Sequence, residues 1–147
     1  MVHSNNLKYR KYQKGRNKGI DTRSKVCFGD FGLKSLECAR ITEKQLLAIE
    51  SVVKRQVKKL GKVWTRIFCD LPVSSKPVEV RMGKGKGSID HWVARIKKGK
   101  ILIELGGVSP EIAKRAFLLA SSKLPIKTVM VYKEKTLTPQ KNGVEQR

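Results

Sequence analysis

The amino-acid sequence predicts an α+β fold, in which two helices pack on one face of a mostly antiparallel sheet. Two segments, 42–60 and 109–124, carry apolar residues at the three- and four-residue spacing of a helix. Short segments rich in β-branched and aromatic residues, typical of strands, lie between and after them. The length of 147 residues fits one domain with a modest core.

That domain is expected to span residues 26–132, with a basic extension (1–25) before it and a polar tail (133–147) after it. Its first element, 28–33, reads Phe-Gly-Asp-Phe-Gly-Leu and predicts a tight turn anchored by aromatic side chains, or a short strand. The first helix follows Thr42, because Thr42 and Gln45 match a capping box. It is expected to end at Gly61. Its buried face is predicted to comprise Leu46, Ile49, Val53, Val57 and Leu60.

The remaining pattern predicts strands separated by a loop, a hairpin and a second helix. Pro72 and Pro77 bracket the loop, and 97–100 is expected to form a hairpin turn with Gly99 at positive φ. The second helix begins at Ser109-Pro110, where serine caps and proline suits the first helical position. The predicted strands are 62–69, 77–80, 89–96, 101–105 and 126–132. The second helix is expected to bury Ile112, Ala116, Phe117, Leu119 and Ala120.

The three cysteines, Cys27, Cys38 and Cys69, are scattered and form no metal-binding pair. The odd count also argues against a disulfide framework. We therefore expect reduced cysteines at packed positions, with no metal and no cofactor. The first apolar run comes too late for a secretory signal, and the basic residues near Met1 are expected to belong to the working protein.

Positive charge dominates the chain, with 33 lysines and arginines against 12 acids and a formal net charge of +21. Such self-repulsion indicates a polyanionic partner, RNA or DNA. A membrane is the weakest candidate, because no apolar run approaches the ~18 residues of a spanning helix. In the basic extension, Tyr9 and Tyr12 stand among the cations, a composition that suits phosphates and unpaired bases. A disordered tail that only aids solubility is the alternative for this segment.

The sequence 81–88, Arg-Met-Gly-Lys-Gly-Lys-Gly-Ser, predicts a contact loop in which glycines allow close approach to phosphates. It is not a nucleotide-binding P-loop, because Lys86 is followed by Gly87 and a strand-like segment. Asp90 and His91 are adjacent, but neighbours in a strand point to opposite faces and are poorly placed to act as an acid–base pair. We therefore expect neither catalysis nor a small-molecule substrate.

Three basic blocks are separated along the chain: the extension, the end of the first helix, and residues 81–100. Scattered blocks favour an embedding in folded RNA over a DNA domain that reads a groove with one element. For the cations at the helix end, Lys54, Arg55, Lys58 and Lys59, phosphate binding and a merely solvated face are equally good interpretations. A protein that compacts nucleic acid without a fixed site remains the alternative for the chain as a whole.

Several of these stretches resemble the ribosomal large-subunit protein sixteen family of bacteria and organelles, over about residues 7–132. The resemblance is most specific at 81–87. The matching stretches are 8–11 (KYRK), 14–19 (KGRNKG), 28–34 (FGDFGLK), 40–42 (RIT), 61–68 (GKVWTRIF), 76–77 (KP), 80–87 (VRMGKGKG), 92–94 (WVA) and 123–128 (KLPIKT).

The resemblance implies a structural constituent of the large ribosomal subunit near the peptidyl-transferase centre. Its partners would be large-subunit rRNA, A-site tRNA and neighbouring ribosomal proteins, and the arginine matching Arg81 is hydroxylated in some bacterial members. Residues 69–73 and 92–96 look like mitochondrially encoded members, which favours the mitochondrion over plastid or bacterial cytoplasm. The residues expected to contact rRNA or tRNA are Lys8, Tyr9, Arg10, Lys11, Lys14, Arg16, Lys18, Arg55, Lys59, Arg66, Arg81, Met82, Gly83, Lys84, Gly85, Lys86 and Gly87.

Overall fold

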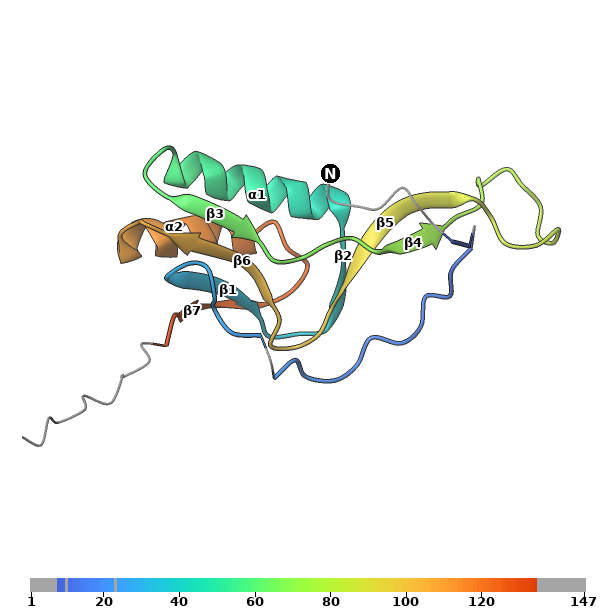
Figure 1. The fold of residues 1–147 in the computed structure, drawn as a ribbon. Helices are drawn as coiled ribbons and strands as arrows, with labels where there is room; N and C mark the ends of the chain where they lie inside the picture. The colour runs from blue at the N-terminus through green and yellow to red at the C-terminus, as the bar shows by residue number, and fades with distance from the viewer. Residues whose placement is uncertain (1–7, 10, 23, 135–147) are drawn as a thin grey trace, which may run out of the picture.

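The computed structural model describes residues 8–9, 11–22 and 24–134. Helices α1 and α2 contact each other and both contact the same sheet (Figure 1), so the expected α+β fold is confirmed. Within the described residues the element order is β1 (Phe31–Ser35), β2 (Ala39–Thr42), α1 (Glu43–Val57), β3 (Lys62–Thr65), β4 (Leu71–Ser74), β5 (Ile89–Ile96), β6 (Ile101–Gly106), α2 (Pro110–Ser121) and β7 (Thr128–Tyr132).

The strands form two antiparallel sheets instead of the single expected one. One sheet has the order β3-β6-β1-β7 and the other the order β2-β5-β4. Gly99 has the expected positive φ of 94°, yet β5 and β6 do not pair with each other, so the predicted hairpin is wrong. The corner around Gly99 pairs with the corner after β1: Gly99 N–H donates to the Ser35 carbonyl (2.8 Å) and Ser35 N–H to the Lys100 carbonyl (2.9 Å). The connection from β1 to β2 and the connection from β5 to β6 therefore cross side by side from one sheet to the other.

Helix α1 begins as the sequence predicts and ends earlier. Gln45 N–H donates to Thr42 Oγ1 (3.3 Å) and Thr42 N–H donates to Gln45 Oε1 (3.0 Å), which completes the capping box. At the other end, Lys58 takes a positive φ of 52° and closes the helix after Val57. Leu60 therefore lies in the following turn with 67% of its surface exposed, and its predicted place in the core is wrong.

The hydrophobic core lies between the two helices and the four-stranded sheet. Alanines on α2 keep its buried face narrow, which suits close packing against α1. Of the expected stripe on α2, Ile112 is only half-buried and Leu119 is exposed, because the buried face is rotated towards Ala113. The core includes Leu33, Leu46, Ile49, Val53, Val57, Ile103, Leu105, Ala113, Ala116, Phe117 and Ala120.

The predicted strand 77–80 is also wrong, since those residues form a turn at the start of a long loop. The strand lies earlier, in β4, where Pro72 pairs with Trp92 of β5. A proline is acceptable there because β4 is an edge strand and the missing N–H faces no neighbouring strand. In the same way the segment predicted as strand 62–69 is regular only over β3.

The three cysteines are free, but only one is packed as expected. Cys69 is buried in the core, whereas Cys27 and Cys38 are exposed. Burial, and then the negative charges of Glu43 and Asp70, raise the pKa of the Cys69 thiol to about 11. Because the thiolate is the reactive form, Cys69 is doubly protected.

We therefore expect iodoacetamide at pH 8 to modify Cys27 and Cys38 of the free folded chain within minutes, and Cys69 only after unfolding in urea. Peptide mass spectrometry at several times would measure the three rates. Labelling of Cys69 at the rate of the other two, without denaturant, would contradict the packed core around it.

Candidate nucleic-acid interface

The loop 75–88 joins β4 to β5 and projects from the three-stranded sheet. In Figure 1 it lies at the right-hand end of the molecule, and both helices lie to its left. Its backbone depends on glycine: Gly83 and Gly85 have φ of 102° and 83°, and Lys84 between them has φ of 53°. A positive φ is rare for a residue with a Cβ, so three successive positive values are possible here mainly because two of the three residues are glycines. No atom of the described residues lies within 4 Å of where a Cβ would stand on Gly83 or Gly85. That side of the loop is therefore open to a partner.

The third glycine of the loop has a different role. A Cβ on Gly87 would stand 2.3 Å from the Ser75 carbonyl oxygen, so Gly87 permits the two sides of the loop to meet. Ser75 N–H donates to the Ser88 carbonyl (3.1 Å) at the same place. Lys76 reaches across and donates from Nζ to the Gly83 carbonyl. The loop is thus closed at its base by its own backbone, while Arg81 and Met82 are exposed near its tip, Met82 to 98%.

The described part of the basic extension runs along the three-stranded sheet. The Asn17 side-chain amide donates to the carbonyls of Ala39 and Ile96, at 2.8 Å each, and so ties the extension to β2 and β5 together. Arg40 donates from Nη2 to the Gly15 carbonyl (2.6 Å). Further along, Asp21 N–H donates to the Lys98 carbonyl (2.7 Å). Backbone carbonyls and one asparagine therefore hold the extension, and its cationic side chains remain exposed.

Lys86 joins the loop to the extension, because its Nζ donates to the Tyr12 carbonyl. Tyr9 and Tyr12 are both exposed, and the Lys8 ammonium lies 5.6 Å from the Tyr9 ring centroid. Arg10 lies outside the described residues. Lys86 thus brings the loop next to the described residues around Tyr12, whereas Asn17 holds a later part of the extension beside Ile96, at the other end of β5. Among the residues that the sequence predicts for the extension and the loop, the exposed ones are Lys8, Tyr9, Lys11, Lys14, Arg16, Lys18, Arg81, Met82, Gly83, Lys84, Gly85 and Lys86.

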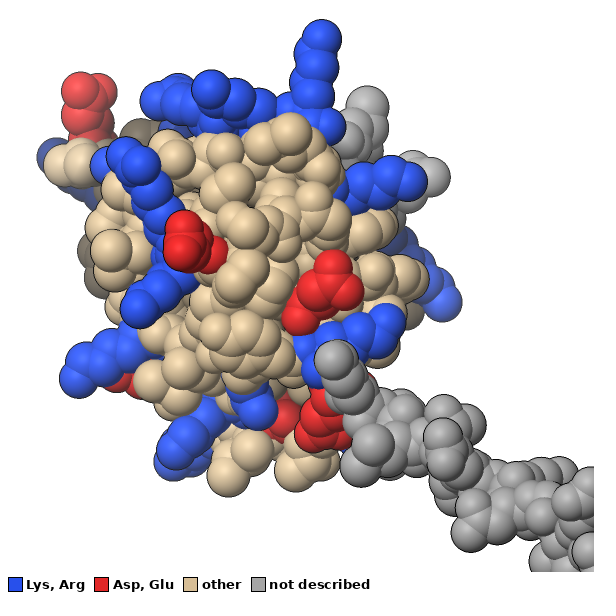
Figure 2. Space-filling model, turned by 90° about the vertical axis from the view of Figure 1, so that its left-hand side faces the viewer, with Lys and Arg blue, Asp and Glu red and all other residues tan. Residues whose placement is uncertain are grey.

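Arg55 and Lys59 do not join this group. They are exposed near the end of α1. Figure 2 looks onto the left-hand side of Figure 1, where blue Lys and Arg side chains stand around much of the outline and fewer red acidic ones lie among them. Positive side chains therefore stand around this face as well as on the loop and the extension, an arrangement that suits contact with a polyanion on more than one side.

Arg66 has a structural partner that the sequence did not predict, the buried carboxylate of Glu104. Ile103 and Leu105 face the core, so Glu104 points to the other face of the sheet, where the segment 24–29 crosses it. Its Oε2 accepts from the N–H groups of the turn at 27–29, at 3.1, 2.7 and 3.0 Å in chain order, and its Oε1 accepts from Arg66 Nη1. The Arg66 guanidinium also lies over the Phe28 ring, 5.0 Å from its centroid.

The charges of this network are mutually stabilised. Burial by itself raises the pKa of Glu104, but the three backbone N–H groups and Arg66 outweigh it and hold that pKa below its ordinary value. Burial lowers the pKa of Arg66, and hydrogen bonding to Cys27 and the charge of Glu104 more than offset it, so the pKa is raised. Arg66 thus supports the 27–29 turn through its ion pair with Glu104. In the sequence, the acidic Glu104 within an otherwise apolar strand was the signal from which this network could have been predicted.

Asp90 and His91 correct another expectation. Although they are neighbours on β5, Asp90 Oδ2 lies 2.9 Å from His91 Nδ1, so the two side chains contact each other. The pair is solvent-exposed, with side chains 58% and 42% accessible. Exposure of both partners leaves them well hydrated, so the contact is a weak surface pair.

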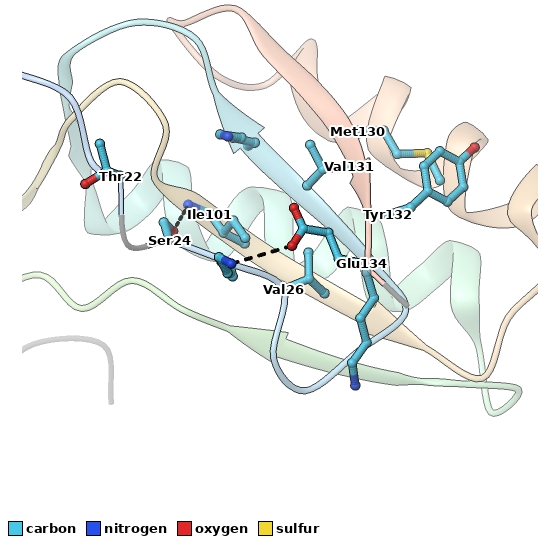
Figure 3. Close-up of a pocket in the computed structure, with 11 residues that line it drawn as sticks. Thr22, Ser24, Val26, Ile101, Met130, Val131, Tyr132 and Glu134 are labelled. Carbon is cyan, nitrogen blue, oxygen red and sulfur yellow. Dashed lines mark hydrogen bonds and ion pairs between the residues drawn. The ribbon is translucent and has the colours of Figure 1, made fainter. Parts of the chain in front are cut away.

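A hollow of about 630 Å³ lies beside residues 24–26 and β7 (Figure 3). Ser24 Oγ accepts from Ile101 N–H (2.7 Å), and Lys25 pairs with Glu134 (3.5 Å) at its edge with both side chains largely exposed. Its labelled Val26, Ile101 and Val131 side chains are apolar. The hollow is the space left where this segment crosses the four-stranded sheet.

No group of three or more potential metal ligands occurs in the described part of the chain. There, too, neither helix has the length and apolar character that crossing a bilayer requires.

Two comparisons with known proteins agree with the resemblance seen in the sequence. The family model described as "Ribosomal protein L16p/L10e" matches residues 4–131. The large ribosomal subunit protein uL16 of Buchnera aphidicola subsp. Cinara cedri (strain Cc) is 51% identical over 133 residues, which cover 90% of this chain and 98% of that protein. The family and the relative are both ribosomal proteins and not enzymes, which confirms the expectation that the chain is not an enzyme. The chain therefore belongs to the ribosomal protein L16p/L10e family.

Proposed function

We propose that this chain is a structural constituent of the large ribosomal subunit and binds rRNA mainly through its 75–88 loop and basic extension. The observation that carries the proposal is the joined, open surface at that end: Lys86 ties the loop to the extension, and the backbone at Gly83 and Gly85 is uncovered. Cations there neutralise phosphates, and bare glycine backbone admits a phosphate chain at close range. Neighbouring large-subunit proteins are the other partners we expect.

The finer placement follows the family resemblance. We propose that the loop points towards the peptidyl-transferase centre and that this end of the protein orders rRNA around the A-site tRNA. Arg81 is exposed, so its side chain is accessible to the hydroxylation that the matching arginine undergoes in some bacterial members of the family. Cross-linking of A-site-bound tRNA to the loop in translating ribosomes would test this placement, and its absence from loop peptides would contradict it.

For the compartment we propose the mitochondrial ribosome, because residues 69–73 and 92–96 look like mitochondrially encoded members. The relative from Buchnera is bacterial, and bacterial cytoplasm and plastid are the alternatives. Fractionation of the source cells with immunodetection of this chain distinguishes the three.

The competing function is non-specific compaction of nucleic acid. Both functions explain the charge, but they differ in their response to salt. Affinity that rests on phosphates alone falls steeply as salt rises, whereas a built-in ribosomal protein stays with its rRNA. Sedimentation of native lysate at moderate and then at high salt tests the proposal. Loss from the large-subunit peak as salt rises, with recovery on DNA, would contradict it.

Replacing Lys84 and Lys86 together by alanine is expected to leave the fold intact and to impair late subunit assembly or translation. Lys84 supplies exposed charge, and Lys86 additionally holds the extension at Tyr12. For each phosphate that is no longer neutralised, the slope of log affinity against log salt should also become shallower by about 0.7–0.9. Gradient profiles of large subunits, growth and urea unfolding are the measurements.

The double change Lys114→Ala with Lys123→Ala, at two exposed lysines outside the loop, is the matched control for loss of two surface charges. Normal profiles and growth in the double variant would speak against the role of the loop.

A further inference from the structure

The extension, β5 and the segment between β3 and β4 enclose a second hollow, of about 460 Å³. It exists because Asn17 holds the extension against Ile96 of β5, which makes the extension one of its walls. Residues 66–70 form the opposite wall. Unlike the hollow of Figure 3, it is lined mostly by charged groups. Among the described residues that line it, the cations are Arg16, Arg66, Arg95, Lys97 and Lys100, against the single carboxylate of Asp70.

Two of these cations already have partners inside the chain. Arg66 is bound to Glu104, and Lys100 lies 3.4 Å from Asp21. Arg16, Arg95 and Lys97 are exposed, and Arg95 and Lys97 also line an adjoining hollow together with Lys100. A concave surface lined by cations concentrates their potential and attracts an anion. The chemistry of these side chains, above all the planar guanidinium of arginine, fits a phosphate.

An aromatic side chain lines the same hollow. In the segment after β3, Ile67 and Cys69 are buried while Phe68 between them is 51% exposed. The alternation turns Phe68 outward, away from the core that its neighbours enter. An exposed ring beside phosphate-binding cations is the arrangement on which proteins stack unpaired bases.

We propose that this hollow binds one unpaired nucleotide of RNA, with its phosphate held by Arg16, Arg95 and Lys97 and its base stacked on Phe68. The inference rests on the proposed function, since that nucleotide would belong to rRNA, and adds a site at the end of β5 opposite to the 81–88 loop. It also gives Asn17 a positioning role, because Asn17 fixes the wall that carries Arg16.

The test uses large subunits that contain the full chain. They are irradiated at 254 nm, digested with nucleases and protease, and the nucleotide-bearing peptides are identified by mass spectrometry. We expect a nucleotide adduct within residues 66–70, and its loss in Phe68→Leu, which keeps an apolar side chain without the ring. Retention on the subunit as salt rises is measured for Phe68→Leu, for the double change Arg95→Gln with Lys97→Gln, and for Lys114→Gln, an exposed lysine of α2 outside the hollow.

Both hollow variants should dissociate on the order of tenfold more readily than wild type, the factor that removal of one stacked base or one neutralised phosphate commonly brings. Lys114→Gln should behave as wild type. Adducts elsewhere in the chain with none in residues 66–70 would overturn the proposal. A defect in the double variant with none in Phe68→Leu would also overturn it, because the hollow would then hold a phosphate alone. Absence of the chain from large subunits would instead refute the proposed function.

Discussion

Glu104→Ala is expected to cost about 3–5 kcal/mol of unfolding free energy, the loss typical of removing one partner of a buried ion pair. The carboxylate is fully buried and receives three backbone N–H groups as well as Arg66. Alanine leaves those donors unsatisfied and the guanidinium without its counter-charge. Because this carboxylate holds the 27–29 turn in place, its loss should also separate Phe28 from Trp64. The two rings are stacked, with 6.3 Å between their centroids.

Urea unfolding of the free chain, followed by tryptophan fluorescence, measures this effect, since Trp64 borders the network. Glu50→Ala is the matched control: it also removes one carboxylate from an ion pair, with Lys54 at 2.6 Å, but on the surface of α1. A pair of that kind is worth about 0.3–0.5 kcal/mol. A Glu104→Ala variant as stable as the Glu50→Ala variant would refute the anchoring role of Glu104.

The same network predicts an acid-dependent loss of stability. The folded-state pKa of Glu104 lies below that of an unfolded glutamate, about 4.3. Its contribution is therefore fully present above the unfolded value and is lost as the pH falls through the lower folded value. Glu104→Gln, which cannot titrate, should reduce the acid slope of stability below pH 4.3 relative to wild type. Identical slopes in the two proteins would show that Glu104 does not carry this charge.

Local sequence signals predict the elements well wherever a cap or a clear period is present. Thr42 with Gln45 and Ser109 with Pro110 mark the beginnings of both helices, although Ser109 makes no side-chain cap bond. The predicted strand 89–96 has the bounds that the structure shows. In each case the information lies within a few residues, so the chain need not be folded to reveal it.

The errors arise where distant segments decide the outcome. Two sheets replace one because Ser35 pairs with the turn at Gly99, a contact between residues 64 positions apart that no local pattern announces. Leu60 is exposed because Lys58 ends α1 early. Residues 77–80 alternate like a strand, but the partner edge of β5 is already taken by β4.

The candidate interface was partly readable in advance. Net charge and the glycine–lysine pattern indicate a phosphate-binding loop, and its tip is exposed as that interpretation requires. Three things were not readable: the contact of Lys86 with Tyr12, the internal role of Gly87, and the commitment of Arg66 to Glu104. None of the three follows from a local pattern: Lys86 and Arg66 bind groups far along the chain, and Gly87 lets the two sides of the loop meet at Ser75.

Gly85→Val is expected to impair assembly of the large subunit far more than its unchanged charge explains. Gly85 has a φ of 83°, a conformation that costs a β-branched residue about 1–3 kcal/mol. We expect the variant to relieve this strain by moving the loop, which would displace Arg81 and Lys84 from the phosphates that we propose they bind. Global stability should change little, because no atom of the described residues lies within 4 Å of the new Cβ and the loop lies outside the core. Gradient profiles and urea unfolding of the same variant measure the two effects separately.

Gly85→Asn decides why glycine is needed there. Asparagine tolerates positive φ far better than valine, so it should preserve the loop conformation. If RNA presses against the backbone at this point, its side chain still occupies the space that the phosphate chain requires, and we expect assembly to suffer as it does with valine. If conformation alone matters, Asn should assemble normally while Val fails. Normal assembly with both would refute close approach and shift the binding role to the cations of the extension.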